Sequence, residues 1–255
     1  MNNLFKIFFF VIKNLNYFYF KKSNIILNRY SSNLKDLKEN GITIVKNYFS
    51  KEDCSRIILE MKDAFAFNKN KFEITKSLDH RLYKFEKYSK YAKKFLNDDH
   101  LNQLIKNYEC HSKIFESTIL AGNIKYILDG KGSGNGWHRD RTFYKYRYSK
   151  AMIYLNDVSL NNGPFQYLEK SHKITNIIKI KYLLQNSFSD KWFENGKIEY
   201  LNQKLKLKIN TVTANAGDLI VFDGTGIHRG KPLIKGERFS LTNYYRFDPT
   251  EKFDF

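Results

Sequence analysis

The 255-residue sequence has few cysteines, few prolines and no long hydrophobic run, and each shortage excludes a class of protein. Its two cysteines, Cys54 and Cys110, form no C-x-x-C pair and are too few for a disulfide framework, which favours a reducing, intracellular setting. Three prolines and thirteen glycines exclude collagen-like and low-complexity chains. The longest apolar run, Ile7 to Ile12, is far shorter than the roughly 20 residues of a membrane-spanning helix, so we expect no such span.

Acidic residues are also scarce, with 26 Asp and Glu against 44 Lys and Arg, and the formal net charge is +18. Such an excess suits anionic partners, which include nucleic acid, an anionic small molecule and a membrane surface. The lysines are scattered, however, and the whole chain is rich in Lys, Asn, Ile, Phe and Tyr. Biased composition therefore explains the charge as directly as a functional surface does, and the charge alone identifies no partner.

Residues 1–32 form a basic, aromatic-rich N-terminal segment that contains no Asp or Glu. This composition is typical of a mitochondrial transit peptide, if the source is eukaryotic, or of a segment that lies on a membrane surface. A helix packed on the following domain is the third interpretation. The alternatives correspond to the mitochondrial matrix, to peripheral membrane contact through residues 1–30 and to the cytoplasm, which is the location that we expect.

Residues 33–255 are predicted to form one domain that is helical first and β-rich later. Apolar periodicity predicts helices over 34–39, 51–67 and 98–108 and a strand over 42–45, and Ser50 with Asp53 outlines a helix cap. Beyond residue 114, turn residues separate short apolar runs, which predicts strands over 114–121, 124–128, 151–155, 218–222 and 239–245. Residues 173–210 are predicted to be an insertion that contains both helical and strand-like segments. This order predicts a mainly β sandwich or barrel with flanking helices, the N-terminal ones packed outside it.

The segment Trp137-His138-Arg139-Asp140 carries the strongest chemical signal in the sequence. Residues i and i+2 of a strand project to the same face, so His138 and Asp140 offer an imidazole nitrogen and a carboxylate oxygen together. His228 follows another predicted strand in a glycine-rich turn. Two histidines and one carboxylate form the facial triad of non-haem Fe(II) oxygenases, which keeps coordination positions open. Because H-x-D alone recurs by chance, this interpretation depends on His228.

Arg238 and Ser240 share one face of the last predicted strand. A guanidinium binds a carboxylate through two parallel hydrogen bonds, and a hydroxyl adds another. The pair can therefore hold the far carboxylate of 2-oxoglutarate while the 2-oxo-acid end of that molecule chelates iron. Taken alone, Arg238 would be interpreted as a surface ion pair with Glu237, and the neighbouring triad motif favours the cosubstrate role.

An ordered set of motifs resembles the phytanoyl-CoA dioxygenase family of Fe(II)/2-oxoglutarate oxygenases over about residues 33–247. The motifs are Gly136–Asp140, Ile153–Val158, Asn162–Phe165, Ser171–Lys173, Ala216–Asp218 and His228. The resemblance implies a double-stranded β-helix core, which is a jelly-roll or cupin-like fold, with His138, Asp140 and His228 as Fe(II) ligands. It also implies that 2-oxoglutarate and O2 are cosubstrates, with Arg238 and Ser240 at the 2-oxoglutarate site.

Two positions depart from the pattern of that family. Arg139 stands between the ligands where Gln is more familiar, and strand geometry should point its side chain away from the metal. Gly230 stands where a small hydroxyl residue often assists the cosubstrate, and Ser240 is expected to compensate. His172, in the matching Ser-His-Lys turn, is expected to be structural and not a fourth ligand.

The resemblance implies hydroxylation of a small-molecule or lipid-type substrate, which an anionic group would suit, with release of succinate and CO2. Two alternatives stay open. The net charge favours a nucleic-acid dealkylating oxygenase of the same fold, although the Asn-Gly-Pro and Ser-His-Lys segments favour the phytanoyl-CoA type. A non-catalytic jelly-roll binding protein is the other alternative, and the intact ligand set argues against it. The aromatic run over 143–148 either lines a substrate entrance or packs on the barrel.

Overall fold

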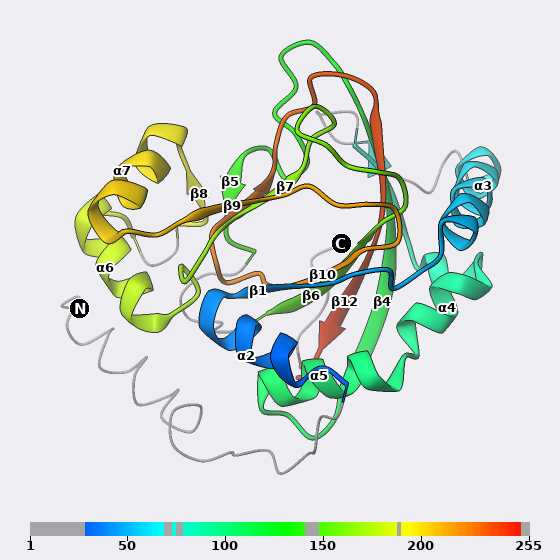
Figure 1. The fold of residues 1–255 in the computed structure, drawn as a ribbon, viewed down its shortest axis with the longest axis horizontal. Coiled ribbons are helices and arrows are strands. Elements are labelled where there is room, and N and C mark those ends of the chain that lie inside the picture. Colours follow the sequence, from blue (N-terminus) through cyan, green and yellow to red (C-terminus); the bar gives the residue numbers. More distant parts are fainter. Residues whose placement is uncertain (1–28, 69–72, 75–78, 141–147, 188–189, 251–255) are drawn as a thin grey trace.

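Two antiparallel sheets face each other in the computed structural model, and helices pack on their outer sides (Figure 1). The structure describes residues 29–68, 73–74, 79–140, 148–187 and 190–250. Predictions on the segment 1–28 and on the aromatic residues 143–147 lie outside the described residues. The division into residues 1–32 and 33–255 stays a prediction.

Seven strands form the larger sheet and five form the smaller one. The larger sheet contains β1 (Ile42–Val45), β2 (Glu73–Ile74), β3 (Asp79–Tyr83), β4 (Glu116–Lys125), β6 (Ser149–Tyr154), β10 (Leu219–Asp223) and β12 (Glu237–Arg246), in the order β1-β10-β6-β12-β4-β3-β2. The smaller sheet contains β5 (Trp137–His138), β7 (Phe165–Leu168), β8 (Trp192–Phe193), β9 (Ile209–Val212) and β11 (His228–Gly230), in the order β8-β5-β11-β7-β9. The chain passes repeatedly between two packed antiparallel sheets, which confirms the predicted jelly-roll class.

The predicted break between strands 114–121 and 124–128 is wrong. One strand, β4 (Glu116–Lys125), runs through the predicted break and ends three residues before the predicted end, and it pairs without interruption along the whole length of β12. Gly122 and Asn123, which suggested a turn, pair directly with Ser240 and Phe239. Pairing on both sides, with β12 and β3, holds this stretch extended despite its weak strand propensity.

The N-terminal helices pack against the larger sheet from outside (Figure 1). They are α2 (Ser31–Asn40), α3 (Lys51–Phe67), α4 (Lys90–Leu96) and α5 (Asp99–Glu109), with the 3-10 turn η1 (Phe85–Lys87) before α4. Ser50 caps α3 as predicted, because its Oγ accepts a hydrogen bond from the N–H of Asp53 at 3.0 Å. Ile57 of α3, Leu104 of α5 and Ile153 of β6 belong to one shared apolar core. The predicted placement of the N-terminal helices outside the β core is therefore confirmed.

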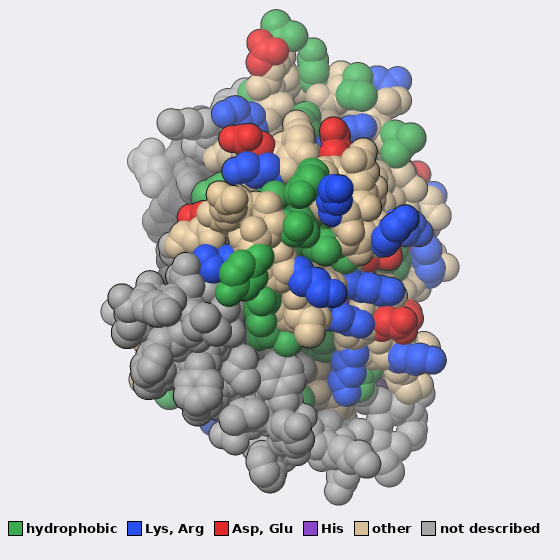
Figure 2. Space-filling model, turned by 90° about the vertical axis from the view of Figure 1, so that its left-hand side faces the viewer, with side chains coloured by type: hydrophobic (Ala, Val, Ile, Leu, Met, Phe, Trp, Pro, Cys, Tyr) green, Lys and Arg blue, Asp and Glu red, His purple; other side chains and the backbone are tan. Residues whose placement is uncertain are grey.

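The segment 173–210 covers the smaller sheet. It contains α6 (Ile174–Leu184) and α7 (Asn195–Leu205), with β8 between them. Ile180 of α6 and Leu201 of α7 pack in one buried cluster with Trp137 of β5. On the outer side of this helix pair, Lys and Arg side chains are dispersed among hydrophobic and neutral ones (Figure 2). Within the described ranges, no helix is both long and apolar enough to cross a membrane.

Candidate metal centre

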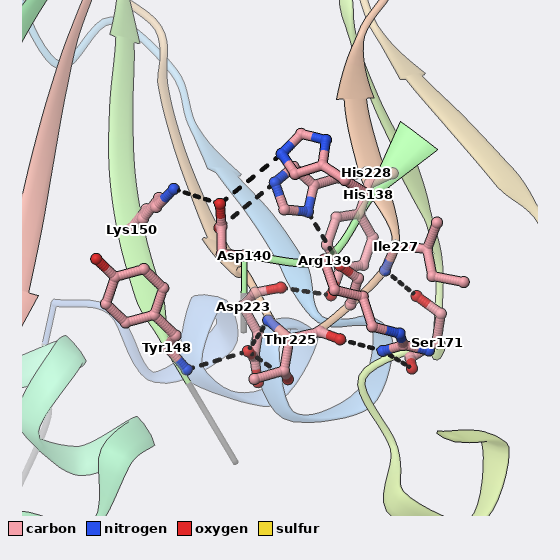
Figure 3. Close-up of polar contacts among 12 residues, drawn as sticks. His138, Arg139, Asp140, Tyr148, Lys150, Ser171, Asp223, Thr225, Ile227 and His228 are labelled. Atoms are coloured by element: carbon pink, nitrogen blue, oxygen red, sulfur yellow. Dashed lines mark hydrogen bonds and ion pairs between the residues drawn. The ribbon is translucent and has the colours of Figure 1, made fainter. Parts of the chain in front are cut away.

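The three predicted metal ligands meet on the inner side of the smaller sheet (Figure 3). His138 ends β5 and His228 begins β11, and the two residues are direct partners across these neighbouring strands. Asp140 comes two residues after His138, where its N–H donates to the carbonyl of Gly224 at 2.8 Å. One potential ligand atom from each residue lies within 4.8 Å of the others. The structure brings the three side chains together, and their role as ligands stays a prediction.

Backbone carbonyls orient both imidazole rings in the same way. Nδ1 of His138 lies 2.9 Å from the carbonyl oxygen of Gly136, and Nδ1 of His228 lies 3.0 Å from that of Gly226. A carbonyl can only accept, so Nδ1 of each ring carries the proton and Nε2 keeps a lone pair. Outer hydrogen bonds of this type fix the tautomer and ring orientation of metal-binding histidines.

The atoms that face each other across the centre are all acceptors. Nε2 of His138 lies 3.8 Å from Oδ1 of Asp140, and Nε2 of His228 lies 3.4 Å from Oδ2. Oδ2 is buried and has no hydrogen-bond partner among the described residues. An unpaired buried acceptor of this kind is costly, and a cation between Oδ2 and the two Nε2 lone pairs would satisfy it. The residues therefore fit a divalent metal ion that binds nitrogen and oxygen donors.

The protonation states of the three side chains also suit a metal. Burial lowers the pKa of His138, and it lowers the pKa of His228 to about 3. Burial alone would raise the pKa of Asp140, but Lys150 and the two histidines outweigh it and bring that pKa to about 2. All three groups are thus deprotonated at neutral pH, as metal binding requires.

These shifts predict how stability depends on pH in the metal-free protein. A histidine whose pKa is lower when folded binds fewer protons than in the unfolded chain, so the free energy of unfolding falls as pH decreases below about 6.5. For His228 the window extends down to about 3, with a slope of at most about 1.4 kcal/mol per pH unit. Urea unfolding between pH 7.5 and 4.5, with chelator present, measures this slope. We expect His228→Gln to flatten it and the exposed His100→Gln not to; equal slopes in both variants would contradict the assignment.

Arg238 and Ser240 lie across the cavity from the histidines, on β12 of the larger sheet. Arg238 is 5% exposed, and one of its Nη atoms donates to the carbonyl of Gly163. Its Nε is buried and has no hydrogen-bond partner in the described part of the chain. A Cβ at Gly230 would come 3.1 Å from the other Nη, so glycine leaves this guanidinium its space. The site therefore keeps guanidinium donors available beside the cavity, and the cosubstrate role of both residues stays a prediction.

The same cavity, of about 250 Å³, contains charged residues that were not predicted from the sequence. Nζ of Lys150 lies 2.7 Å from Oδ1 of Asp140. Arg81 donates twice to Oδ2 of Asp79, from Nε at 2.9 Å and from Nη2 at 2.8 Å. Ser133 donates to the same oxygen at 2.9 Å. Lys150 directly precedes the apolar part of β6, Ala151–Tyr154, so nothing in the local pattern marked it as a residue of the site.

Arg139 and His172 lie apart from the three-residue cluster. The Arg139 guanidinium donates to the carbonyls of Ser171, at 3.0 Å, and of Thr225, on the side away from the cluster (Figure 3). The prediction that Arg139 points away from the metal position is thus confirmed. His172 is buried with Nε2 3.3 Å from the carbonyl oxygen of Lys38, a contact that fits its predicted structural role.

Gly224 provides a local test of the metal position. A Cβ at this residue would overlap Oδ2 of Asp140, the oxygen for which the described residues provide no hydrogen-bond partner. We expect Gly224→Ala to displace the carboxylate and to weaken Co(II) binding by at least about tenfold, as disturbed ligand orientation does. Gly196→Ala is the matched control, because a Cβ there meets nothing within 4 Å. Equal Co(II) affinities of both variants in calorimetric titration would contradict this geometry.

Two imidazoles and one carboxylate on the inner side of a jelly roll are the donor set of non-haem Fe(II) oxygenases. The sequence model of the phytanoyl-CoA dioxygenase family matches residues 37–234. The chain belongs to this family, as its motifs indicated. A search of curated proteins gave no match.

Solved structures of similar fold include the alpha ketoglutarate dependent enzymes SnoN and SnoK from nogalamycin biosynthesis. EctD from S. alaskensis, solved with bound Fe, is 13% identical with a TM-score of 0.67, over 89% of this chain and 79% of that one. The epimerase SnoN, in complex with Fe3+, alpha ketoglutarate and nogalamycin RO, is 15% identical with a TM-score of 0.59, over 83% and 81%. A Pseudomonas putida prolyl-4-hydroxylase is 15% identical with a TM-score of 0.58, over 86% and 100%. At these identities the likeness shows the fold.

Proposed function

We propose that this protein is an Fe(II)- and 2-oxoglutarate-dependent dioxygenase that hydroxylates a small-molecule or lipid-type substrate and releases succinate and CO2. The observation that carries the proposal is the cluster of His138, Asp140 and His228, which lies in one cavity with Arg238. Family membership supports it, as do the iron and alpha ketoglutarate bound in the SnoN structure.

Each residue of the cavity has a defined task in this proposal. Nε2 of His138, Nε2 of His228 and Oδ2 of Asp140 would hold Fe(II), and Arg238 with Ser240 would bind the far carboxylate of 2-oxoglutarate. Iron, 2-oxoglutarate and O2 together supply the oxidising power. The protein holds the ligands deprotonated and would orient the cosubstrate through the guanidinium of Arg238.

The charges that line the cavity favour an anionic substrate. Arg81, Lys150 and Arg238 are cationic, whereas Asp79 and Asp140 are anionic, which leaves one positive charge in excess. Fe(II) and doubly ionised 2-oxoglutarate would cancel each other. A substrate with one carboxylate or a similar anionic group would therefore balance the loaded site.

The nucleic-acid alternative is supported by the net charge of +18 alone. On the outer face of α6 and α7, the basic side chains are dispersed and not gathered along a groove (Figure 2). A nucleic-acid surface normally presents clustered Lys and Arg along the path of the backbone. The match to the phytanoyl-CoA dioxygenase family model supports the small-molecule function instead.

Anaerobic titration with Fe(II) and then 2-oxoglutarate, followed by a succinate-release screen, tests the proposed function. The screen should include small carboxylic acids, acyl-CoA esters, neutral analogues of both and single-stranded nucleic acid. We expect iron-dependent succinate release that rises with an anionic small molecule. A correctly folded protein that binds neither Fe(II) nor 2-oxoglutarate would instead be the non-catalytic binding protein, and steeply salt-dependent turnover of nucleic acid would indicate the dealkylating alternative.

A further inference from the structure

Lys150 is a buried cation that reaches the centre from the opposite sheet. It lies on β6 of the larger sheet, and its side chain is 10% exposed. Its Nζ lies 2.7 Å from Oδ1 of Asp140 and approaches that carboxylate from the side away from the two imidazoles (Figure 3). A charge-assisted hydrogen bond of this length is among the strongest that a carboxylate accepts.

Aromatic rings hold the ammonium group in place. Nζ lies 4.6 Å from the ring centroid of Tyr244 and 5.4 Å from that of Tyr148. Both distances are within the range of cation–π attraction. Among the described residues, the carboxylate within ion-pair distance of Nζ is that of Asp140. The surroundings of Lys150 therefore direct its charge toward one oxygen atom.

The two oxygens of Asp140 are consequently not equivalent. Oδ1 accepts from Lys150, whereas Oδ2 has no hydrogen-bond partner in the described structure and lies 3.4 Å from Nε2 of His228. Carboxylates bind metal ions through either one or two oxygens. An oxygen that already accepts a short bond from an ammonium group is a poor second ligand, because the cation competes for its lone pairs.

We propose that Lys150 is a positioning residue that holds Oδ1 of Asp140, so that Asp140 offers a metal ion only Oδ2. The inference rests on the proposed function and deepens it. A carboxylate bound through one oxygen leaves three positions of an octahedral ion open, enough for a bidentate cosubstrate and one more ligand. A carboxylate bound through both oxygens would occupy one of these positions.

The charge of Lys150 also opposes the metal, because like charges a few ångströms apart in a buried site repel. Removal of Lys150 should therefore move two affinities in opposite directions. The metal ion should bind more tightly, since the repulsion is gone and a second oxygen becomes available. The cosubstrate should bind less tightly to the loaded protein, since one coordination position is taken and a cation is missing. Loss of folding would instead weaken the binding of both the metal ion and the cosubstrate.

The test compares Lys150→Met with Lys150→Gln and with the wild-type protein. Co(II) and then 2-oxoglutarate are titrated anaerobically by calorimetry, and the absorption spectrum of the cobalt-loaded protein reports the coordination number. For Lys150→Met we expect Co(II) to bind about tenfold more tightly and 2-oxoglutarate about tenfold more weakly, within the range of outer-sphere changes. Lys150→Gln keeps an N–H donor without the charge, so it should retain the tighter Co(II) binding and recover part of the 2-oxoglutarate affinity.

Lys125→Met is the matched control, because Lys125 is an exposed residue at the end of β4 and does not line the cavity. It should leave both affinities and the spectrum unchanged. Unaltered affinities in Lys150→Met, or a loss of both, would overturn the role of Lys150, and thermal unfolding shows whether the second outcome reflects misfolding. If the wild-type protein itself binds neither Co(II) nor 2-oxoglutarate, the proposed function fails, which distinguishes the two failures.

Discussion

Asp140→Ala should abolish metal binding and substrate-dependent succinate release while the jelly roll stays folded. The substitution removes the single carboxylate of the cluster and leaves two neutral imidazoles. Outer-sphere changes around metal sites typically cost roughly 10- to 100-fold in affinity, and loss of a ligand should exceed that range. Calorimetric titration with Co(II) and a succinate assay measure the two effects. Wild-type Co(II) affinity and full turnover in Asp140→Ala would end the proposed assignment.

The Asp140 variant needs a control for Lys150, because removal of one partner of a buried ion pair leaves the other uncompensated. Such a loss costs about 3–5 kcal/mol of stability in typical proteins. We therefore expect Asp140→Ala to unfold at a lower urea concentration than the wild type, and Asp140→Ala combined with Lys150→Met to regain part of this loss. Neither variant should bind Co(II). Recovery of stability without recovery of metal binding separates the electrostatic role of Asp140 from its role as a ligand.

Arg238→Met should weaken 2-oxoglutarate binding without altering the affinity for the metal. Removal of one partner of a buried charged pair costs about 2–5 kcal/mol, which corresponds to a Kd increase of roughly 30-fold to several thousand-fold. Arg238→Lys keeps the charge but cannot form the bidentate hydrogen bond, so its Kd for 2-oxoglutarate should lie between those of the wild type and Arg238→Met. The measurement is a 2-oxoglutarate titration of the Co(II)-loaded protein.

Arg246→Met is the matched control for this prediction. Arg246 ends the same strand, β12, where its guanidinium pairs with the half-exposed Glu116, and it is not among the described residues that line the cavity. Arg246→Met should leave the affinities for Co(II) and for 2-oxoglutarate unchanged. If Arg238→Met and Arg246→Met gave the same 2-oxoglutarate Kd as the wild type, another cation, such as Arg81, would have to anchor the cosubstrate.

The parts of the site that lie close together in sequence were predictable. His138 and Asp140 are two residues apart, and the expectation that they share one side holds although β5 ends at His138. His228 was found because it follows an apolar strand in a glycine-rich turn, and the pairing of β5 with β11 places it opposite His138. The sandwich or barrel class followed from many short apolar runs between turn residues, which is a property of the whole domain and survives errors in single strands, and the family resemblance implied the jelly-roll core.

Contacts between the two sheets were not predictable in the same way. Lys150 is ten residues from Asp140 in the sequence, yet Lys150 lies on the larger sheet whereas Asp140 follows β5 of the smaller one, and their contact depends on how the two sheets stack. Asp79 and Arg81 fall in a charged, aromatic stretch without clear periodicity, where no element was assigned. The unbroken strand β4 escaped prediction because its course past Gly122 is decided by pairing with β12 and β3, not by local preference.

The two sheets contribute different halves of the site. Both imidazoles come from the smaller sheet, whereas Arg238 and Lys150 come from the larger one. A small slide of one layer over the other would change the span between the metal and the guanidinium without changing the nitrogen ligands themselves. Mild heating, or a substitution that loosens the packing between the layers, should therefore weaken the binding of 2-oxoglutarate before it weakens the binding of the metal ion.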